Sequence, residues 1–275
     1  MMTGSKIFAL FQSVIRLIKK VIKIYLIDPF IGAGETLYLI FRVVLSLPHL
    51  VFKINVTLHQ MYIYGFKSLF VVSVVAVFTG MLLSLQSGLA LKDFGQEELV
   101  GQLLVVTLTR EMAPFMTALI LSASVGSAMA AEIGTMKVSE EIDALEVMSI
   151  DPVKFLVLPR MVGFTIMIPV LSNYASLLGI LGGSLVAKTQ LGVEYETFYD
   201  LALSVLKSKT GLKDIWVGNF KAFVFGLIIS SISCHQGLKA QGGAIGVGRA
   251  VRLSVVLSYL FVIMFGYFIS AIFYR

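Results

Sequence analysis

Five apolar stretches constrain the fold of this chain more than any other feature of its sequence. Each is about 20 residues long, which is the length that an α-helix needs to cross the hydrocarbon core of a bilayer. With 57% hydrophobic and 14% charged residues, the chain also departs from soluble proteins, in which about a quarter of the residues are charged. The sequence therefore predicts an all-α, polytopic membrane protein with five transmembrane helices, at residues 66–91, 112–131, 161–187, 214–234 and 252–273.

The first 65 residues are predicted to form a basic segment that lies on the membrane ahead of the five-helix domain, residues 66–275. Over residues 6–27, apolar side chains recur on one side of a helix, and the other side carries Arg16, Lys19, Lys20 and Lys23. A basic amphipathic helix of this kind lies in the interface plane, whereas a signal peptide would need an unbroken apolar core. Residues 30–47 and 49–65 are predicted to follow as a weaker helix and an elbow that also contact the membrane.

Lysine and arginine residues are distributed unevenly about the five spans. Of the 22 in the chain, fourteen lie in the first 67 residues and in the loops 132–160 and 235–252. Because cytoplasmic loops carry the excess of Lys and Arg, we expect the N-terminus in the cytoplasm and the C-terminus outside. The net charge of +6 then reflects topology and anionic lipid headgroups, and no nucleic-acid partner is expected. In the outside connection, residues 195–207 are predicted to form a short helix.

No arrangement typical of a catalytic or metal site is present in the sequence. There is one cysteine, Cys234, and the three histidines are scattered without ligand spacing. No Ser-His-Asp, Cys-His or paired-carboxylate pattern occurs at catalytic spacing. We therefore expect a protein that is not an enzyme, with no metal and no cofactor of its own, so that energy for uphill movement would come from another protein.

An acidic amphipathic helix is predicted over residues 139–150, between the second and third spans. Ser139 is placed to cap its first turn, where Glu140 and Glu141 would favour the helix dipole, and Pro152 would stop it. On a helical wheel, the apolar side consists of Val138, Ile142, Leu145 and Met148, and the polar side of Glu140, Asp143 and Glu146. We interpret this helix as a docking element for a cytoplasmic partner; the alternative is an ordinary surface loop with a solvated charged face.

Ionisable side chains within or beside the spans mark a second candidate site. Arg110 and Glu111 lie just outside the second span and precede Pro114, which can kink a helical stretch that we expect to begin near Leu99. Lys221 lies seven residues after Asp214 on the same helix face. Because a charge in the bilayer costs about 2.5 to 3.5 kcal/mol, such groups face a partner or a water-filled cavity. We predict an outward-facing polar pocket lined by Arg110, Glu111 and Lys221 and suited to an anionic headgroup. The alternative is a structural Glu111–Lys221 ion pair that only orients helices.

Small residues recur at four-residue spacing along the second span, at Ala118, Ser122, Gly126 and Ala130. Such a pattern allows helix backbones to approach closely. We expect close helix packing within one subunit, and the alternative is a homodimer seam.

Three motifs resemble those of a known family. They are REMAP at 110–114, GSAMAAEIGTMKVSEEIDALEVMSIDPVKFLVLPR at 126–160 and GAIGVGRA at 243–250. They are similar to the MlaE/YrbE family of ABC-transporter permeases, and the resemblance covers roughly residues 60–275. It implies a homodimer in a bacterial inner membrane, bound to a cytoplasmic ATPase pair that holds the ATP, to a periplasmic ring of MCE-domain proteins and often to a STAS-domain subunit. It also implies that phospholipid or a related lipid moves between the inner membrane and the periplasmic side.

The resemblance also suggests roles for particular residues. Residues 139–150 resemble the family's coupling helix, and Arg110, Glu111 and Lys221 resemble residues near its lipid cavity. Two departures imply a thinner charge network: Ser124 stands where the family commonly has an arginine, and no carboxylate follows Asp214.

Two other functions fit the same sequence. One is an ion-coupled carrier that uses Glu111 and Lys221 as a relay. The other is a scaffold that anchors an envelope complex without transporting anything. The absence of a Ser-rich, acid-poor transit region favours a bacterial membrane over a plastid envelope.

Overall fold

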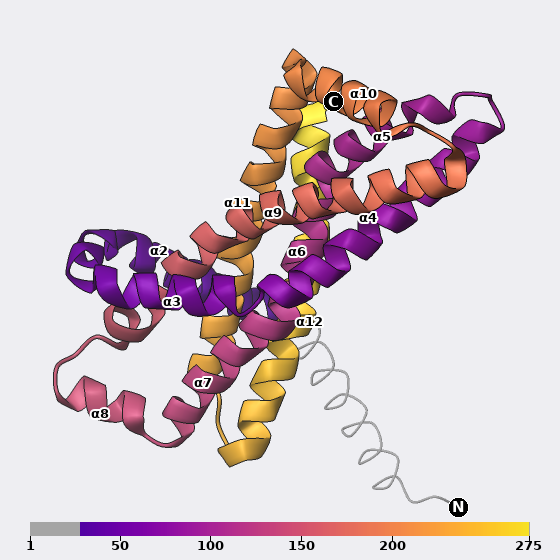
Figure 1. Ribbon diagram of the computed structural model, residues 1–275. Helices are drawn as coiled ribbons and strands as arrows, with labels where there is room; N and C mark the ends of the chain where they lie inside the picture. Colours follow the sequence, from indigo (N-terminus) through magenta and orange to yellow (C-terminus); the bar gives the residue numbers. More distant parts are fainter. Residues whose placement is uncertain (1–27, 275) are drawn as a thin grey trace, which may run out of the picture.

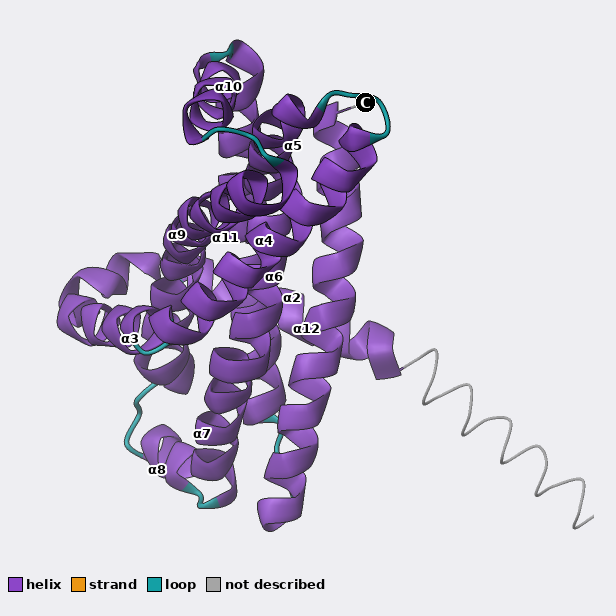
Figure 2. Ribbon diagram, turned by 45° about the vertical axis from the view of Figure 1, so that its right-hand side comes forward, coloured by secondary structure: helices purple, strands orange, loops and turns teal. Residues whose placement is uncertain are grey.

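The computed structural model describes residues 28–274, and within this range the chain is helical and has no strands (Figures 1 and 2). Five helices are long and apolar enough to cross a membrane. The predicted all-α, five-span class is therefore confirmed. The basic helix predicted over residues 6–27 lies outside the described residues.

The five spanning helices are longer than the apolar stretches that predicted them. They are Leu69–Lys92, Glu97–Val138, Val153–Leu191, Lys209–Leu238 and Gly243–Tyr274. In element terms these are α4 (Leu69–Lys92), η3 (Glu97–Leu99) to α7 (Ser127–Val138), η6 (Val153–Val157) with α9 (Leu158–Leu191), α11 (Lys209–Leu238) and α12 (Gly243–Tyr274).

The helix that contains the second apolar stretch begins at Glu97, close to the predicted start near Leu99, and so extends well before residue 112. It runs as α5 (Val100–Thr107), the π-turn η4 (Leu108–Met112), α6 (Ala113–Leu121) and the π-turn η5 (Ser122–Gly126) into α7. Arg110 and Glu111 therefore lie within this continuous helix, in the π-turn η4. Single π-turns inside helices are frequent at functional sites.

Short helices occupy the two ends of the bundle and one side of it. Helix α8 (Glu141–Val147) lies at one end and α10 (Tyr195–Lys207) at the other, next to the C-terminus (Figures 1 and 2). The predicted short helix at 195–207 is confirmed. The segments α2 (Asp28–Leu45), η2 (Leu47–Lys53) and α3 (Ile54–Phe66) form the elbow beside α9 and α11.

Helices α4 and α9 cross with their backbones in direct contact. A Cβ atom added to Gly80 would lie 1.9 Å from the carbonyl oxygen of Gly179, and one added to Gly182 would lie 2.5 Å from that of Val77. Only glycine fits such an approach. Ser84 adds a hydrogen bond of 2.9 Å from its hydroxyl to the carbonyl of Gly183.

The small residues of the second span pack against α11 of the same chain. All four (Ala118, Ser122, Gly126 and Ala130) are buried. A Cβ on Gly126 would lie 3.0 Å from Ser233 Oγ, and a Cβ on Gly237 would lie 3.1 Å from the carbonyl oxygen of Ala130. The structure thus places this stripe inside the subunit.

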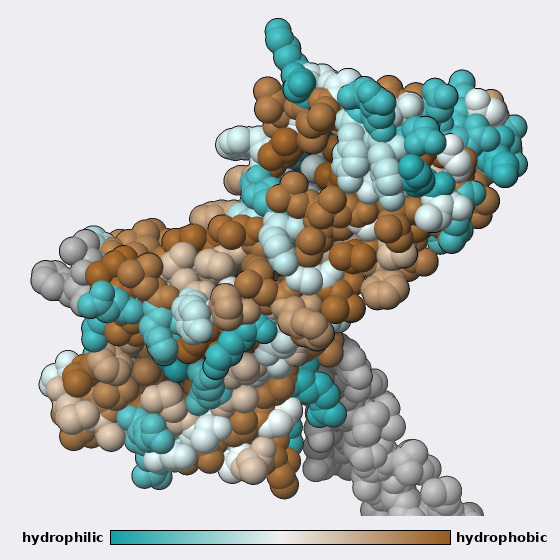
Figure 3. Space-filling view, viewed as in Figure 1, coloured by the Kyte–Doolittle hydropathy of each residue, from teal (hydrophilic) through white to brown (hydrophobic). Residues whose placement is uncertain are grey.

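Large apolar side chains remain exposed along the middle of the molecule. Hydrophobic residues cover much of the face in Figure 3, and hydrophilic residues gather toward its ends. On α4, for example, Phe70, Phe78 and Leu82 are all more than half exposed. A soluble protein rarely exposes so much contiguous apolar surface, so this belt faces lipid.

We expect Gly80→Ala to destabilise the bundle, because the new methyl group would collide with the backbone of α9. Overpacking of this kind costs about 1–3 kcal/mol. Gly248→Ala is the matched control, since nothing lies within 4 Å of a Cβ at that position. The midpoint of thermal unfolding in detergent measures the stability of both purified variants. Equal midpoints for the two variants would contradict the close α4–α9 contact.

Candidate functional site

Four ionisable residues of the second and fourth spans, Arg110, Glu111, Asp214 and Lys221, form one network at the α10 end of the bundle. Arg110 donates from Nε to Asp214 Oδ1 (3.1 Å) and from Nη2 to Asp214 Oδ2 (3.0 Å). This two-point geometry is the strongest form of an arginine–carboxylate pair. Asp214 itself is only 1% exposed, so the guanidinium supplies the compensation that its buried charge requires.

Lys221 is the centre of the second half of the network. Its Nζ donates to Glu111 Oε1 (2.5 Å), Ser270 Oγ (2.7 Å) and the carbonyl oxygen of Arg110 (3.1 Å). An ammonium group has three N–H donors, so all of them are satisfied. The side chain is 1% exposed, and burial of its positive charge is tolerated because each donor has an acceptor.

Helix α12 closes the network with two hydroxyl groups. Ser270 Oγ donates to Glu111 Oε1 (2.8 Å), and Tyr274 Oη donates to Asp214 Oδ1 (2.6 Å). The Tyr274 ring also lies 4.1 Å from the guanidinium carbon of Arg110, a cation–π contact. We call these six residues, Arg110, Glu111, Asp214, Lys221, Ser270 and Tyr274, the charge network.

The residues predicted to line an outward-facing polar pocket, Arg110, Glu111 and Lys221, are all paired within the charge network. In this single chain, two cations face two anions, and Lys221 lies beneath the surface. Arg110 and Glu111 keep 30% and 40% of their side-chain surface exposed, and Ser270 and Tyr274 of α12 are also partly exposed. The Glu111–Lys221 ion pair, given as the alternative, is present. Asp214, predicted to share a face with Lys221, pairs with Arg110.

Sequence reasoning missed Ser270 and Tyr274. No carboxylate occurs in the last span, which predicted a thinner network, yet these two hydroxyls take part in it. They lie four residues apart on α12 and thus share one helix face. Two hydroxyl residues at that spacing in an apolar span were the available signal. Ser124, at the position of an expected arginine, is exposed and donates to the carbonyl of Ile120.

An aromatic ladder lies beside the charge network. The ring of Trp216 stacks on that of Phe220, with centroids 5.9 Å apart and planes 2° apart, and both contact Phe273. Lys213 donates from Nζ to the carbonyl oxygen of Phe273 (2.7 Å). The end of α12 is therefore tied to α11 by side chains on both sides of the network.

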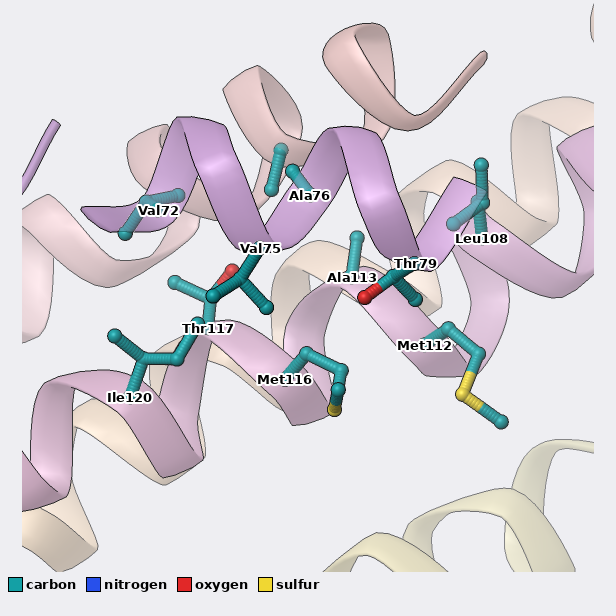
Figure 4. Close-up of a pocket in the computed structure, with 11 residues that line it drawn as sticks. Val72, Val75, Ala76, Thr79, Leu108, Met112, Ala113, Met116, Thr117 and Ile120 are labelled. Atoms are coloured by element: carbon teal, nitrogen blue, oxygen red, sulfur yellow. The ribbon is translucent and has the colours of Figure 1, made fainter. Parts of the chain in front are cut away.

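A narrow apolar crevice separates α4 from the second span. Its free volume is about 10 Å³, near that of one water molecule. Figure 4 shows side chains of α4 on one side and those of η4 and α6 on the other. Val75 and Thr79 come from α4, and Met112 and Met116 from the opposite wall. Met112 directly follows Glu111 in the sequence, but the crevice faces α4 whereas the charge network faces α11 and α12.

The acidic helix at the other end is shorter than predicted. Helix α8 covers Glu141–Val147, and Ser139 does not cap it. Instead α7 continues to Val138, and Ser139 is its C-terminal cap. Glu140 then takes a left-handed conformation (φ 61°) that turns the chain into α8.

The apolar face of α8 does not consist of all the residues that the helical wheel predicted. Ile142 is 2% exposed and anchors the helix, and Leu145 is half-buried. Met148 was predicted on this apolar side, but it lies past the helix end and is 61% exposed, beside Val147 at 86%. The exposed surface of α8 therefore combines two apolar side chains with acidic ones, namely Glu140, Glu141, Asp143 and Glu146. Asp143 accepts a hydrogen bond from Lys137 Nζ (2.5 Å).

Fold and sites together define a polytopic helical membrane protein with paired charges in its spans and an exposed amphipathic helix at one end. The family model described as Permease MlaE matches residues 57–272. The chain belongs to the MlaE permease family.

Curated relatives match the sequence of this chain over most of its length. A probable ABC transporter permease protein of Synechocystis is 36% identical over 78% of this chain and 80% of its own length. The intermembrane phospholipid transport system permease protein MlaE of Haemophilus influenzae is 33% identical over 90% of this chain and 93% of its own length. The chloroplastic protein TRIGALACTOSYLDIACYLGLYCEROL 1 of Arabidopsis thaliana is 32% identical over 80% of this chain and 61% of its own length.

Removing one partner of the Arg110–Asp214 pair should destabilise the protein more than removing both partners. Arg110→Met leaves a buried carboxylate uncompensated, which typically costs about 3–5 kcal/mol. The double variant Arg110→Met/Asp214→Asn removes that charge and should recover much of the loss. Thermal unfolding in detergent measures the cycle, with the exposed Lys207→Met as control. A double variant as unstable as the sum of its two single variants would show that the pair has no such compensating role.

Proposed function

We propose that this protein is the permease subunit of an ABC-type transporter that moves phospholipid or a related lipid between the inner membrane and the periplasmic side. Membership of the MlaE permease family carries the proposal. The Haemophilus relative, whose name describes intermembrane phospholipid transport, supports the lipid substrate. The chain itself would supply the path, and a separate ATPase would bind and hydrolyse the ATP.

In this proposal the α8 end is cytoplasmic. The first 67 residues and the loops near α8 and at the start of α12 together carry fourteen of the 22 Lys and Arg residues, an excess that is typical of the cytoplasmic side. Exposed Val147 and Met148 would enter an apolar groove on the ATPase, and the acidic residues of α8 would meet basic residues at its rim. A small apolar centre with a charged border is the usual composition of a protein interface.

The charge network would respond to the lipid at the opposite end. Arg110 is partly exposed and pairs with one carboxylate, so a lipid phosphate could compete with Asp214 for its guanidinium. Rearrangement of the network would then connect headgroup binding to the positions of α11 and α12.

The assembly would contain two copies of this chain. We propose a homodimer in a bacterial inner membrane, with the N-terminus cytoplasmic, an MCE-domain ring protein on the periplasmic side and a STAS-domain subunit on the ATPase. The part of each second span around Arg110 and Glu111 that stays exposed in one subunit would line a shared lipid cavity.

Reversing the charges of α8 should abolish ATPase binding. In the variant Glu140→Lys/Asp143→Lys/Glu146→Lys, the exposed surface would repel a basic rim while Ile142 still anchors the helix. We expect loss of the ATPase from affinity-purified complexes. The matched control is Glu196→Lys/Asp200→Lys on α10, which alters exposed acids at the opposite end. Full recovery of an active ATPase with the α8 variant would contradict the docking role.

Removing the Glu111–Lys221 pair should stop lipid movement without dismantling the complex. We expect Glu111→Ala/Lys221→Ala to co-purify with the ATPase and yet to lose ATP-dependent transfer of fluorescent phospholipid between proteoliposomes and acceptor protein. The paired removal leaves no uncompensated charge, which limits the effect on folding. Undiminished transfer would favour a scaffold. Transfer that persists without ATP and collapses with a protonophore would favour an ion-coupled carrier.

A further inference from the structure

Helix α2 presents two different faces. Leu39 and Val43 are buried against the bundle, whereas Leu37, Tyr38 and Phe41 are all more than half exposed. The exposed face is thus apolar and suited to lipid. Glu35 and Arg42, which are seven residues apart, lie on the same side of the helix as Leu39.

Arg42 ties α2 to the connection that follows α8. Its Nη2 donates to both carboxylate oxygens of Asp151, at 2.9 and 3.0 Å. Asp151 Oδ1 also accepts a hydrogen bond of 3.0 Å from the backbone N–H of Val153, the first residue of η6. The residues between Val147 and Asp151 are turns without a regular helix. The ion pair therefore holds a non-helical connection that would otherwise link α8 to α9 loosely.

Glu35 ties the same helix to α11. Its Oε2 accepts a hydrogen bond from Lys239 Nζ and lies 3.4 Å from His235 Nε2. Lys239 is the C-terminal cap residue of α11, and His235 lies in the last turn of that helix. Both ties of α2 thus end on elements that reach the α8 end of the bundle.

Helix α11 runs without interruption from Lys209 to Leu238. It carries Asp214 and Lys221 of the charge network toward one end and His235 at the other. A continuous helix moves largely as a rod. A displacement of its last turn therefore also displaces Asp214 and Lys221 in the charge network, roughly 30 Å away at 1.5 Å per residue.

We propose that α2 is a strap that transmits movement of α8 to α11 and so to the charge network. The order of contacts is α8, Asp151, Arg42, Glu35, Lys239 and α11. This inference rests on the proposed function and adds a positioning role for Arg42 and Glu35, neither of which touches ATPase or lipid in it. Burial of Leu39 and Val43 keeps α2 attached when one ion pair is lost, so the ties serve coupling more than folding.

The test measures lipid transferred per ATP hydrolysed in the reconstituted permease–ATPase complex. In Glu35→Lys and in Lys239→Glu, like charges face each other, and we expect the ratio to fall about threefold, in line with the loss of a partly exposed ion pair. ATPase co-purification and the rate of ATP hydrolysis should stay unchanged. The exchanged pair, Glu35→Lys/Lys239→Glu, should restore the ratio because attraction returns with opposite polarity.

The matched control is the exposed ion pair between Lys188, in the last turn of α9, and Glu194, the N-cap of α10, whose charged atoms are 3.3 Å apart. Reversing either of its charges should leave the ratio unchanged. The strap is overturned if the single variants transport normally, if they lose the ATPase, or if the exchanged pair fails to recover. Failure of the proposed function is distinct, because the unaltered complex would then show no ATP-driven lipid transfer.

Discussion

Mutual compensation of charges within the spanning helices is the constraint on which the rest of this structure depends. Asp214 and Lys221 are both 1% exposed, and a buried ion without a partner would cost several kcal/mol. Their partners are consecutive residues, Arg110 and Glu111, on a single π-turn. The second span and α11 must therefore keep one register, and α12 must end where its hydroxyls reach the same carboxylates. The network thus fixes how three spans meet.

Length and composition were sufficient to predict the spans, because any helix in lipid must be long and apolar. The apolar stretch of the second span began only at residue 112, whereas the helix that contains it begins at Glu97. Arg110 and Glu111 resemble the edge of a membrane segment when they are considered alone, and only their partners on α11 make them tolerable inside a helix that begins at Glu97. Pairing between distant segments is not visible in a local window. Ser270 and Tyr274 were missed for the same reason.

The local signals at α8 were less informative than they looked. Ser139 has the side chain of a good cap, but α7 extends to Val138 and uses Ser139 for its own end. The turn is made by Glu140 in a left-handed conformation, which residue preferences disfavour outside glycine and asparagine. The acidic character of the segment was nevertheless correct. Composition therefore predicted which surface is exposed, and tertiary contacts decided where the helix begins and which apolar residues it leaves uncovered.

The aromatic ladder beside the charge network has a practical consequence. Trp216 is the single tryptophan of the chain, and it lies two residues beyond Asp214 with its ring stacked on Phe220. Nearly all of the intrinsic emission of this protein excited at the red edge of its absorption therefore comes from one point on α11. Trp216 is thus an intrinsic fluorescent probe at the point where the second, fourth and fifth spans meet. Changes at that point during turnover can be followed without an added dye.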